Sequence, residues 1–117
     1  MATTYKLERP DHKTPKLYET EEQGDSALVQ SHYFIPGTGI DWYVIEYDPE
    51  SDICFCWTEL IPSCGEFGYT YMKEMEDLRI DVPLISSSET LMLNVVVELD
   101  KHWSPLPIGE VLRLRGL

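Results

Sequence analysis

A chain of 117 residues is the usual size of one domain and is long enough to fold around its own core without a metal ion or a disulfide. Its hydrophobic content of 43% argues against wholesale disorder, and no stretch approaches the ~20 consecutive apolar residues of a membrane span. The formal charge is −12, and residues 17–72 hold eleven acids without one lysine or arginine. Such a one-signed field repels nucleic acid and attracts basic surfaces, so direct binding to a phosphate backbone is not expected.

The first 16 residues differ from the rest in composition. They contain Pro10, Pro15 and alternating charges with little apolar content, so we expect an extended or mobile lead-in at residues 1–16 and a single domain over residues 17–117. This lead-in lacks the apolar segment of a secretory signal, which predicts a cytoplasmic protein.

Three segments in the first half of the chain predict β-strands. Residues 27–35 are rich in β-formers and end at the breaker "PGTG". Residues 41–48 and 53–60 alternate apolar side chains, and "DPES" between them suits a type I turn, which predicts an antiparallel hairpin. Strict alternation would divide residues 42–47 between two faces: Tyr43, Ile45 and Tyr47 on one, and Trp42, Val44 and Glu46 on the other.

The period of the pattern changes after a short predicted strand at residues 67–69. Tyr71, Met75 and Leu78 follow one another at i, i+4 and i+7, which predicts a helix over about residues 71–80. Thr70 stands where an N-cap is expected.

The last third of the chain completes the predicted fold. Residues 81–89 are rich in serine and predict a linker, whereas the apolar residues 90–99 predict a central strand and residues 109–114 a short C-terminal helix. We therefore predict an α+β domain with a four- or five-stranded, mostly antiparallel sheet, one inserted helix and one covered sheet face.

The three cysteines, Cys54, Cys56 and Cys64, cannot all pair within one chain, which favours free thiols in a reducing compartment. Cys54 and Cys56 share a strand face about 7 Å apart, and with Cys64 and His32 they offer four ligands of the kind that zinc prefers. The spacing is not the usual zinc spacing, and cysteine is often a buried small hydrophobe. Packed thiols without a metal are therefore the main interpretation, and a small metal-binding or enzymatic protein is the alternative.

A second candidate for chemistry lies near the C-terminus. Glu98, Asp100 and His102 alternate, so they would share one strand face, where they can bind a hard cation or transfer protons. The alternative is the solvated end of a strand. No nucleotide-binding motif is present, and we assign no catalytic residue, metal or cofactor.

The acids of the predicted hairpin are candidates for a partner-binding surface rather than for catalysis. They form no EF-hand pattern and surround a turn, where charge also discourages edge-to-edge aggregation. The predicted partner-binding residues are Asp41, Glu46, Asp48, Glu50, Asp52 and Glu59.

Four strings carry a resemblance to a known family: "LYETE", "HYFIPGTGIDWYVIEYDP", "EFGY" and "VELDKHWSPLPIGEVL". Over about residues 16–112 the chain resembles small bacterial, plasmid and phage proteins that are grouped as a domain of unknown function. It departs from their pattern at Tyr71, where the family tends to have a serine helix cap, and at residues 82–94, which replace a shorter connection. The resemblance implies a mobile-element setting, near functions for plasmid upkeep and evasion of host defence.

These observations predict a non-enzymatic, acidic interaction protein. Its negative surface, in the manner of a DNA mimic, is expected to dock on a basic, nucleic-acid-binding host protein such as a defence factor and block it. A homodimeric adaptor is a further alternative, with Trp42, Trp57 and Trp103 as candidate interface aromatics.

Overall fold

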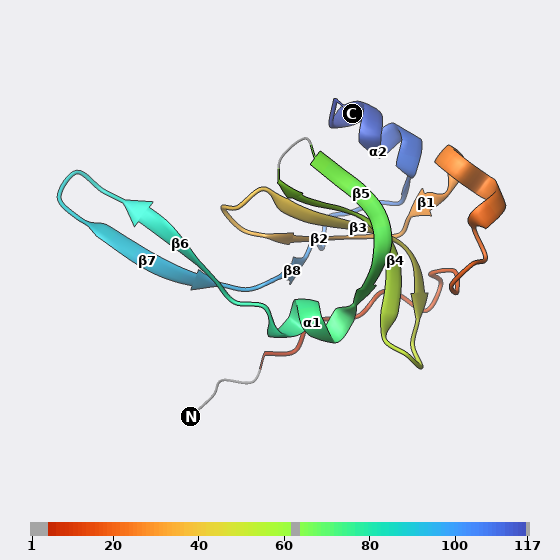
Figure 1. Ribbon diagram of the computed structural model, residues 1–117, viewed down its shortest axis with the longest axis horizontal. Coiled ribbons are helices and arrows are strands. Elements are labelled where there is room, and N and C mark those ends of the chain that lie inside the picture. The colour runs from red at the N-terminus through yellow and green to blue at the C-terminus, as the bar shows by residue number, and fades with distance from the viewer. Residues whose placement is uncertain (1–4, 62–63, 117) are drawn as a thin grey trace.

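The computed structural model describes residues 5–61 and 64–116, and it confirms the predicted α+β class (Figure 1). A five-stranded antiparallel sheet has the order β5–β4–β3–β2–β8. Its strands are β2 (Ser31–Ile35), β3 (Ile40–Asp48), β4 (Ile53–Ile61), β5 (Cys64–Tyr71) and β8 (Glu98–Leu99). The other elements are the 3-10 helix η1 (Glu21–Ser26), β1 (Leu28–Val29), α1 (Met72–Asp77), β6 (Ile80–Ile85), β7 (Thr90–Val95), β9 (Leu106–Pro107) and α2 (Ile108–Leu114).

The hairpin of β3 and β4 is the centre of the sheet, and its prediction is confirmed. The turn between them is closed by Asp48, whose carboxylate accepts hydrogen bonds from the Glu50 N–H at 3.1 Å and the Ser51 hydroxyl at 2.7 Å. Side-chain acceptors of this kind give the chain a local reason to reverse. The predicted first strand is divided at Gln30 into β1, which pairs with β9, and β2, which pairs with β3.

A β-bulge in β3 overturns part of the predicted alternation. The register with β4 shifts between Val44 and Glu46, so Ile45 is the extra residue. A bulge turns the side chains that follow it onto the opposite face. Tyr47 therefore packs in one cluster with Trp42 and Val44, whereas Tyr43 and Ile45 pack on the other face. The expectation that Tyr47 would share a face with Tyr43 is wrong for this reason.

Both faces of the sheet are covered, not one as predicted. Met72 and Met75 of α1 pack on the first face together with Leu7 and Val97. The second face is covered by α2 and by the chain before β1. Residues 5–16 form no helix or strand, yet the side chain of Leu7 is buried in the first core cluster.

The segment after β5 differs most from its prediction. Helix α1 ends at Asp77 because Leu78 takes an extended conformation, with ψ of 132°, and leads into β6. Tyr71 holds the N-cap position without a side-chain hydrogen bond. Thr70 lies in β5, so the prediction that Thr70 caps this helix is wrong.

Residues 81–89 are not a linker, and residues 90–99 are not a central strand. Strands β6 and β7 form a separate two-stranded hairpin that projects from the body as an arm (Figure 1). The apolar run of β7 pairs only with β6 and leaves Leu91, Met92 and Leu93 about half exposed. Only β8, at residues 98–99, joins the main sheet, at its edge.

The predicted C-terminal helix is confirmed as α2, which begins one residue earlier, at Ile108. Within the described part of the chain, no helix has the length and apolar character needed to cross a bilayer.

Candidate functional site

Most of the acids that were predicted to meet a partner are held inside the fold. Glu46 is 2% exposed, Glu59 is 0% exposed and Asp41 is also buried, while Asp52 is engaged in an ion pair. Of the six predicted residues, only Glu50 is fully exposed, and Asp48 and Asp52 are half-buried. The predicted six-residue binding surface therefore does not exist as one exposed patch.

Asp41 and Glu59 belong to a chain of charges that connects the sheet to the C-terminus. Arg115 follows α2 and donates two hydrogen bonds to Glu59, at 3.1 Å from Nε and 2.7 Å from Nη2. The same guanidinium lies 3.7 Å from the Asp41 carboxylate. A buried carboxylate is tolerated when it is paired and hydrogen-bonded in this way, so these two acids have partners inside the fold.

The chain of charges continues to His32 on β2. Its Nε2 lies 2.7 Å from Asp41 and its Nδ1 lies 2.9 Å from Asp100, so both ring nitrogens have carboxylate partners within the fold. Burial acts to lower the pKa of His32, but the hydrogen bonds to the two carboxylates outweigh it and raise that pKa above its ordinary value. The ring also stacks on Tyr43 at 4.8 Å between centroids.

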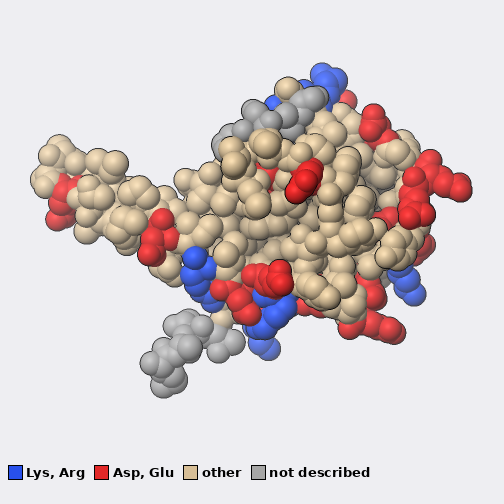
Figure 2. Space-filling view, in the orientation of Figure 1, with Lys and Arg blue, Asp and Glu red and all other residues tan. Residues whose placement is uncertain are grey.

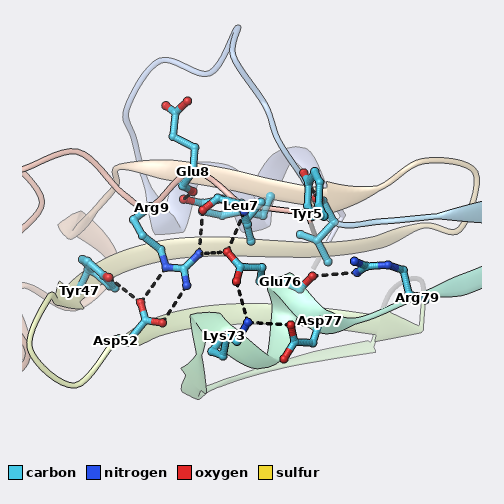
Figure 3. Close-up of polar contacts among 12 residues, drawn as sticks. Tyr5, Leu7, Glu8, Arg9, Tyr47, Asp52, Lys73, Glu76, Asp77 and Arg79 are labelled. Carbon is cyan, nitrogen blue, oxygen red and sulfur yellow. Dashed lines mark hydrogen bonds and ion pairs between the residues drawn. The ribbon is translucent and has the colours of Figure 1, made fainter. Parts of the chain in front are cut away.

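Asp52 is part of a second network, which holds the N-terminal segment against the body (Figure 3). The Arg9 guanidinium donates to both Asp52 oxygens, at 2.8 and 3.0 Å, and to Glu76 of α1 at 2.9 Å. The hydrogen bond from the Leu7 N–H, followed by the contacts with Lys73 and Arg9, lowers the pKa of Glu76 to about 2. Asp52 is therefore a structural residue as well.

Glu46 is the exception among the buried acids. Its oxygens accept hydrogen bonds from the Tyr18 N–H at 2.9 Å, the Thr20 N–H at 2.9 Å and the Thr20 hydroxyl at 2.5 Å, all of which are neutral donors. No lysine or arginine of residues 5–61 and 64–116 forms an ion pair with it. The carboxylate of Glu46 therefore has hydrogen-bond donors but no cationic partner among these residues.

Glu46 lies at the side of a groove of about 380 Å³ between η1 and the second face of the sheet. The bulge in β3 is what turns this carboxylate toward η1. Glu21 and Asp25 of η1 add exposed carboxylates at the rim. The full lining is Thr20, Glu21, Gly24, Asp25, Ala27, Ile45, Glu46, Phe55, Phe67, Tyr69 and Ile108.

Aromatic rings form one wall of this acidic groove. Phe55 of β4 lies 5.7 Å from Phe67 and 5.1 Å from Tyr69 between ring centroids, and Tyr18 lies 6.0 Å from Tyr69. Phe67 is 44% exposed and Tyr69 is 52% exposed, so their faces remain accessible. Carboxylates beside accessible aromatic faces are the combination that binds ammonium and guanidinium groups.

Exposed acids surround the same part of the surface. Figure 2 shows acidic side chains gathered on the side of the molecule that carries η1 and the β3–β4 turn. Their residues are Glu19, Glu21, Glu22, Asp25, Asp48 and Glu50, of which Asp48 is half-buried. The name acidic groove is used below for the groove between η1 and the sheet together with these six surrounding acids.

The structure does not assemble the two alternative sites for chemistry. Cys54 and Cys56 are buried while Cys64 is exposed, and the contact with Cys56 together with burial raises the pKa of Cys54. Asp100 pairs with His32, whereas Glu98 and His102 are exposed. Among residues 5–61 and 64–116, no group of three histidine, cysteine or acidic side chains is placed to hold a metal ion.

Comparisons with protein-family models, with characterised proteins and with solved structures found no match to this chain. The acidic groove therefore rests on its own geometry. Its central residue, Glu46, was among the predicted site residues, but Glu21, Asp25, Phe67 and Tyr69 were not. These four residues lie in the strings "TEEQGD" and "EFGY", which by their composition indicate a polar turn and a short strand but no binding site.

Proposed function

We propose that this protein is a non-enzymatic interaction protein that binds cationic side chains of a basic protein partner in the acidic groove. The observation that supports this proposal best is the environment of Glu46. Its buried carboxylate accepts hydrogen bonds from neutral donors only, and it lies at the side of a groove that is also lined by aromatic rings. A lysine or arginine that enters the groove meets this charge in a partly desolvated site, where a charge–charge interaction is stronger than in water.

The charge of the surroundings supports the same partner. The acids of η1 and the β3–β4 turn are exposed, and their field attracts a positively charged protein over a Debye length of ~8 Å at physiological salt. The resemblance to plasmid and phage proteins favours a nucleic-acid-binding host protein, such as a defence factor, as the basic partner. Binding would then block the surface that the partner uses for nucleic acid, in the manner of a DNA mimic.

The test compares two pairs of isosteric substitutions that change the net charge equally. Glu21→Gln with Asp25→Asn removes charge from the groove, whereas Glu74→Gln with Glu89→Gln removes it from exposed positions elsewhere. Wild-type protein and both variants are used as bait in host lysate, and each recovered basic protein is then measured for binding and for inhibition of its DNA binding.

We expect the groove variant to lose at least tenfold in affinity, because each charge-assisted contact contributes about 1.5 to 3 kcal/mol. The control variant should bind as the wild type does. Equal loss in the two variants would reduce the interaction to net charge alone and contradict a groove. Recovery of no basic protein would contradict the function as a whole.

A further inference from the structure

Strand β5 is the outer strand of the main sheet and has no strand beside it among the residues that the structure describes. It is eight residues long, from Cys64 to Tyr71, and pairs with β4 along one side only. In an antiparallel ladder, alternate residues turn their N–H and C=O groups away from the neighbouring strand. The outer side of β5 therefore presents a row of backbone donors and acceptors.

Natural proteins usually protect such an edge, and the side chains of β5 provide little protection, although a register shift between Glu59 and Ile61 of β4 lies opposite its first residues. β5 contains no lysine and no proline, and it carries a single charged residue, Glu66. An unprotected edge of this length is a template for another extended segment, as in the binding mode called β-augmentation.

Two grooves accompany the edge, one on each face of the sheet. Phe67 and Tyr69 supply β5 backbone and also line the acidic groove on the second face. A larger groove, of about 530 Å³, is lined by every residue of the range 64–70. Its remaining lining is mostly apolar and consists of Trp42, Thr58, Leu60 and Ile61.

The alternation of a strand relates these two grooves to each other. Successive side chains of an added strand point to opposite faces, so odd positions would lie over one groove and even positions over the other. The acidic groove suits a lysine or arginine side chain. The larger groove suits an aliphatic side chain, which would lie beside Trp42, and the acidic residue in the lining of this groove is Glu66.

We propose that an extended segment of the basic partner adds as a sixth strand along β5, with alternating cationic and aliphatic side chains. This inference rests on the proposed function, and it names the form of the ligand. Charge disfavours the competing occupant, a second copy of this chain, because β5–β5 pairing would bring together two acidic grooves on molecules that each carry −12.

The probe is a peptide of alternating arginine and valine, as long as β5, with blocked ends. Two further peptides carry N-methyl groups, one on every arginine nitrogen and one on every valine nitrogen. Only one of these two sets of nitrogens can face β5, because hydrogen bonds to a neighbouring strand alternate along the backbone. Affinities are measured by titration calorimetry, and the amide exchange of β5 is followed with and without peptide.

We expect the unmodified peptide to bind and to slow the amide exchange of β5. One methylated peptide should lose at least tenfold in affinity, and the other should bind within about threefold of the unmodified peptide, because each lost hydrogen bond costs about 1 kcal/mol. Equal affinity of all three peptides would overturn strand addition and leave the proposed function standing.

The proposed function has its own readout in the same assay. The groove variant, Glu21→Gln with Asp25→Asn, should bind the unmodified peptide with at least tenfold lower affinity. The control variant, Glu74→Gln with Glu89→Gln, should bind it with the affinity of the wild type. If the groove variant binds unchanged, or if no peptide binds, both proposals fail. A dimer in sedimentation whose β5 amides are already protected without peptide would show that a second copy fills the edge, and would overturn the inference.

Discussion

Carboxylates of the same residue type take opposite roles in this chain according to the donors that reach them. Glu59 meets the Arg115 guanidinium and Glu46 meets two backbone N–H groups and a hydroxyl, although both side chains are almost fully buried. The first carboxylate is paired with a cation inside the fold. The second has neutral donors only and lies beside the groove.

His32 gives the fold a dependence on pH whose sign follows from its partners. The raised pKa of His32 in the folded state means that the folded protein holds this proton more tightly than the unfolded chain does. Its contribution to stability is therefore complete below the unfolded pKa of about 6.5 and is lost as the pH rises through the higher folded value. The hydrogen bonds to Asp41 at 2.7 Å and to Asp100 at 2.9 Å favour the protonated ring.

We predict that the free energy of unfolding falls as the pH rises above about 6.5, and that His32→Gln removes most of this fall. At about pH 6 the substitution should cost about 2 kcal/mol, because it removes charge-assisted hydrogen bonds from two carboxylates. Urea denaturation at a series of pH values measures both effects. A variant that keeps the wild-type slope would show that another group is responsible.

The arm formed by β6 and β7 is the element whose stability is least supported by the rest of the molecule. One of its faces is entirely aliphatic, but only Ile80 and Val95 at its base pack against the first core cluster. Leu84 and Leu91 farther out are about half exposed. A two-stranded hairpin is marginally stable by itself, so the outer arm should open without the body.

We predict that replacing residues 83–92 by a short Asn-Gly turn changes the stability of the domain by less than about 1 kcal/mol, because this part of the arm contributes little to the core. Ile80 and Val95 are kept in this variant. Thermal unfolding measures the effect, and amide exchange in the wild type should be faster in the outer arm than in β3. A loss of several kcal/mol would mean that the arm supports the body in solution.

At the scale of the whole molecule, the net charge of −12 opposes the compact state. Residues 17–72 contain no lysine or arginine, and the arginines that pair with acids of this region, Arg9 and Arg115, come from the two ends of the chain. The exposed acids of η1 and the β3–β4 turn repel one another across solvent. Salt screens such exposed charges more strongly than it screens buried pairs.

We predict that sodium chloride raises the melting temperature between about 20 and about 300 mM, because screening relieves this repulsion. The same salt should weaken binding of the arginine–valine peptide, so stability and affinity move in opposite directions. Thermal unfolding and titration at matched salt concentrations provide the comparison. A melting temperature that falls with salt would show that ion pairs, and not repulsion, dominate the surface.

Local chemistry decided the parts of this fold that the sequence predicts. Alternating apolar residues and the acceptor Asp48 specify the β3–β4 hairpin within about twenty residues, and the periodic end of the chain specifies α2. The strand predicted at residues 90–99 is misplaced because β-propensity does not say whether a strand joins the sheet or leaves it as an arm, and the serine-rich residues 81–89 conceal the strand that pairs with it.

By itself the sequence determined the sign of the protein's charge, the α+β class and the central hairpin, since each depends on composition or on neighbours in the chain. Only the tertiary structure decided which acids are paired inside the fold and which are exposed. Asp52 and Glu59 are paired with arginines 43 and 56 residues away, and the bulge in β3 directs Glu46 to η1. Such pairings depend on contacts between distant segments, and the physical environment of a carboxylate, whether water, arginine or a groove, is set there.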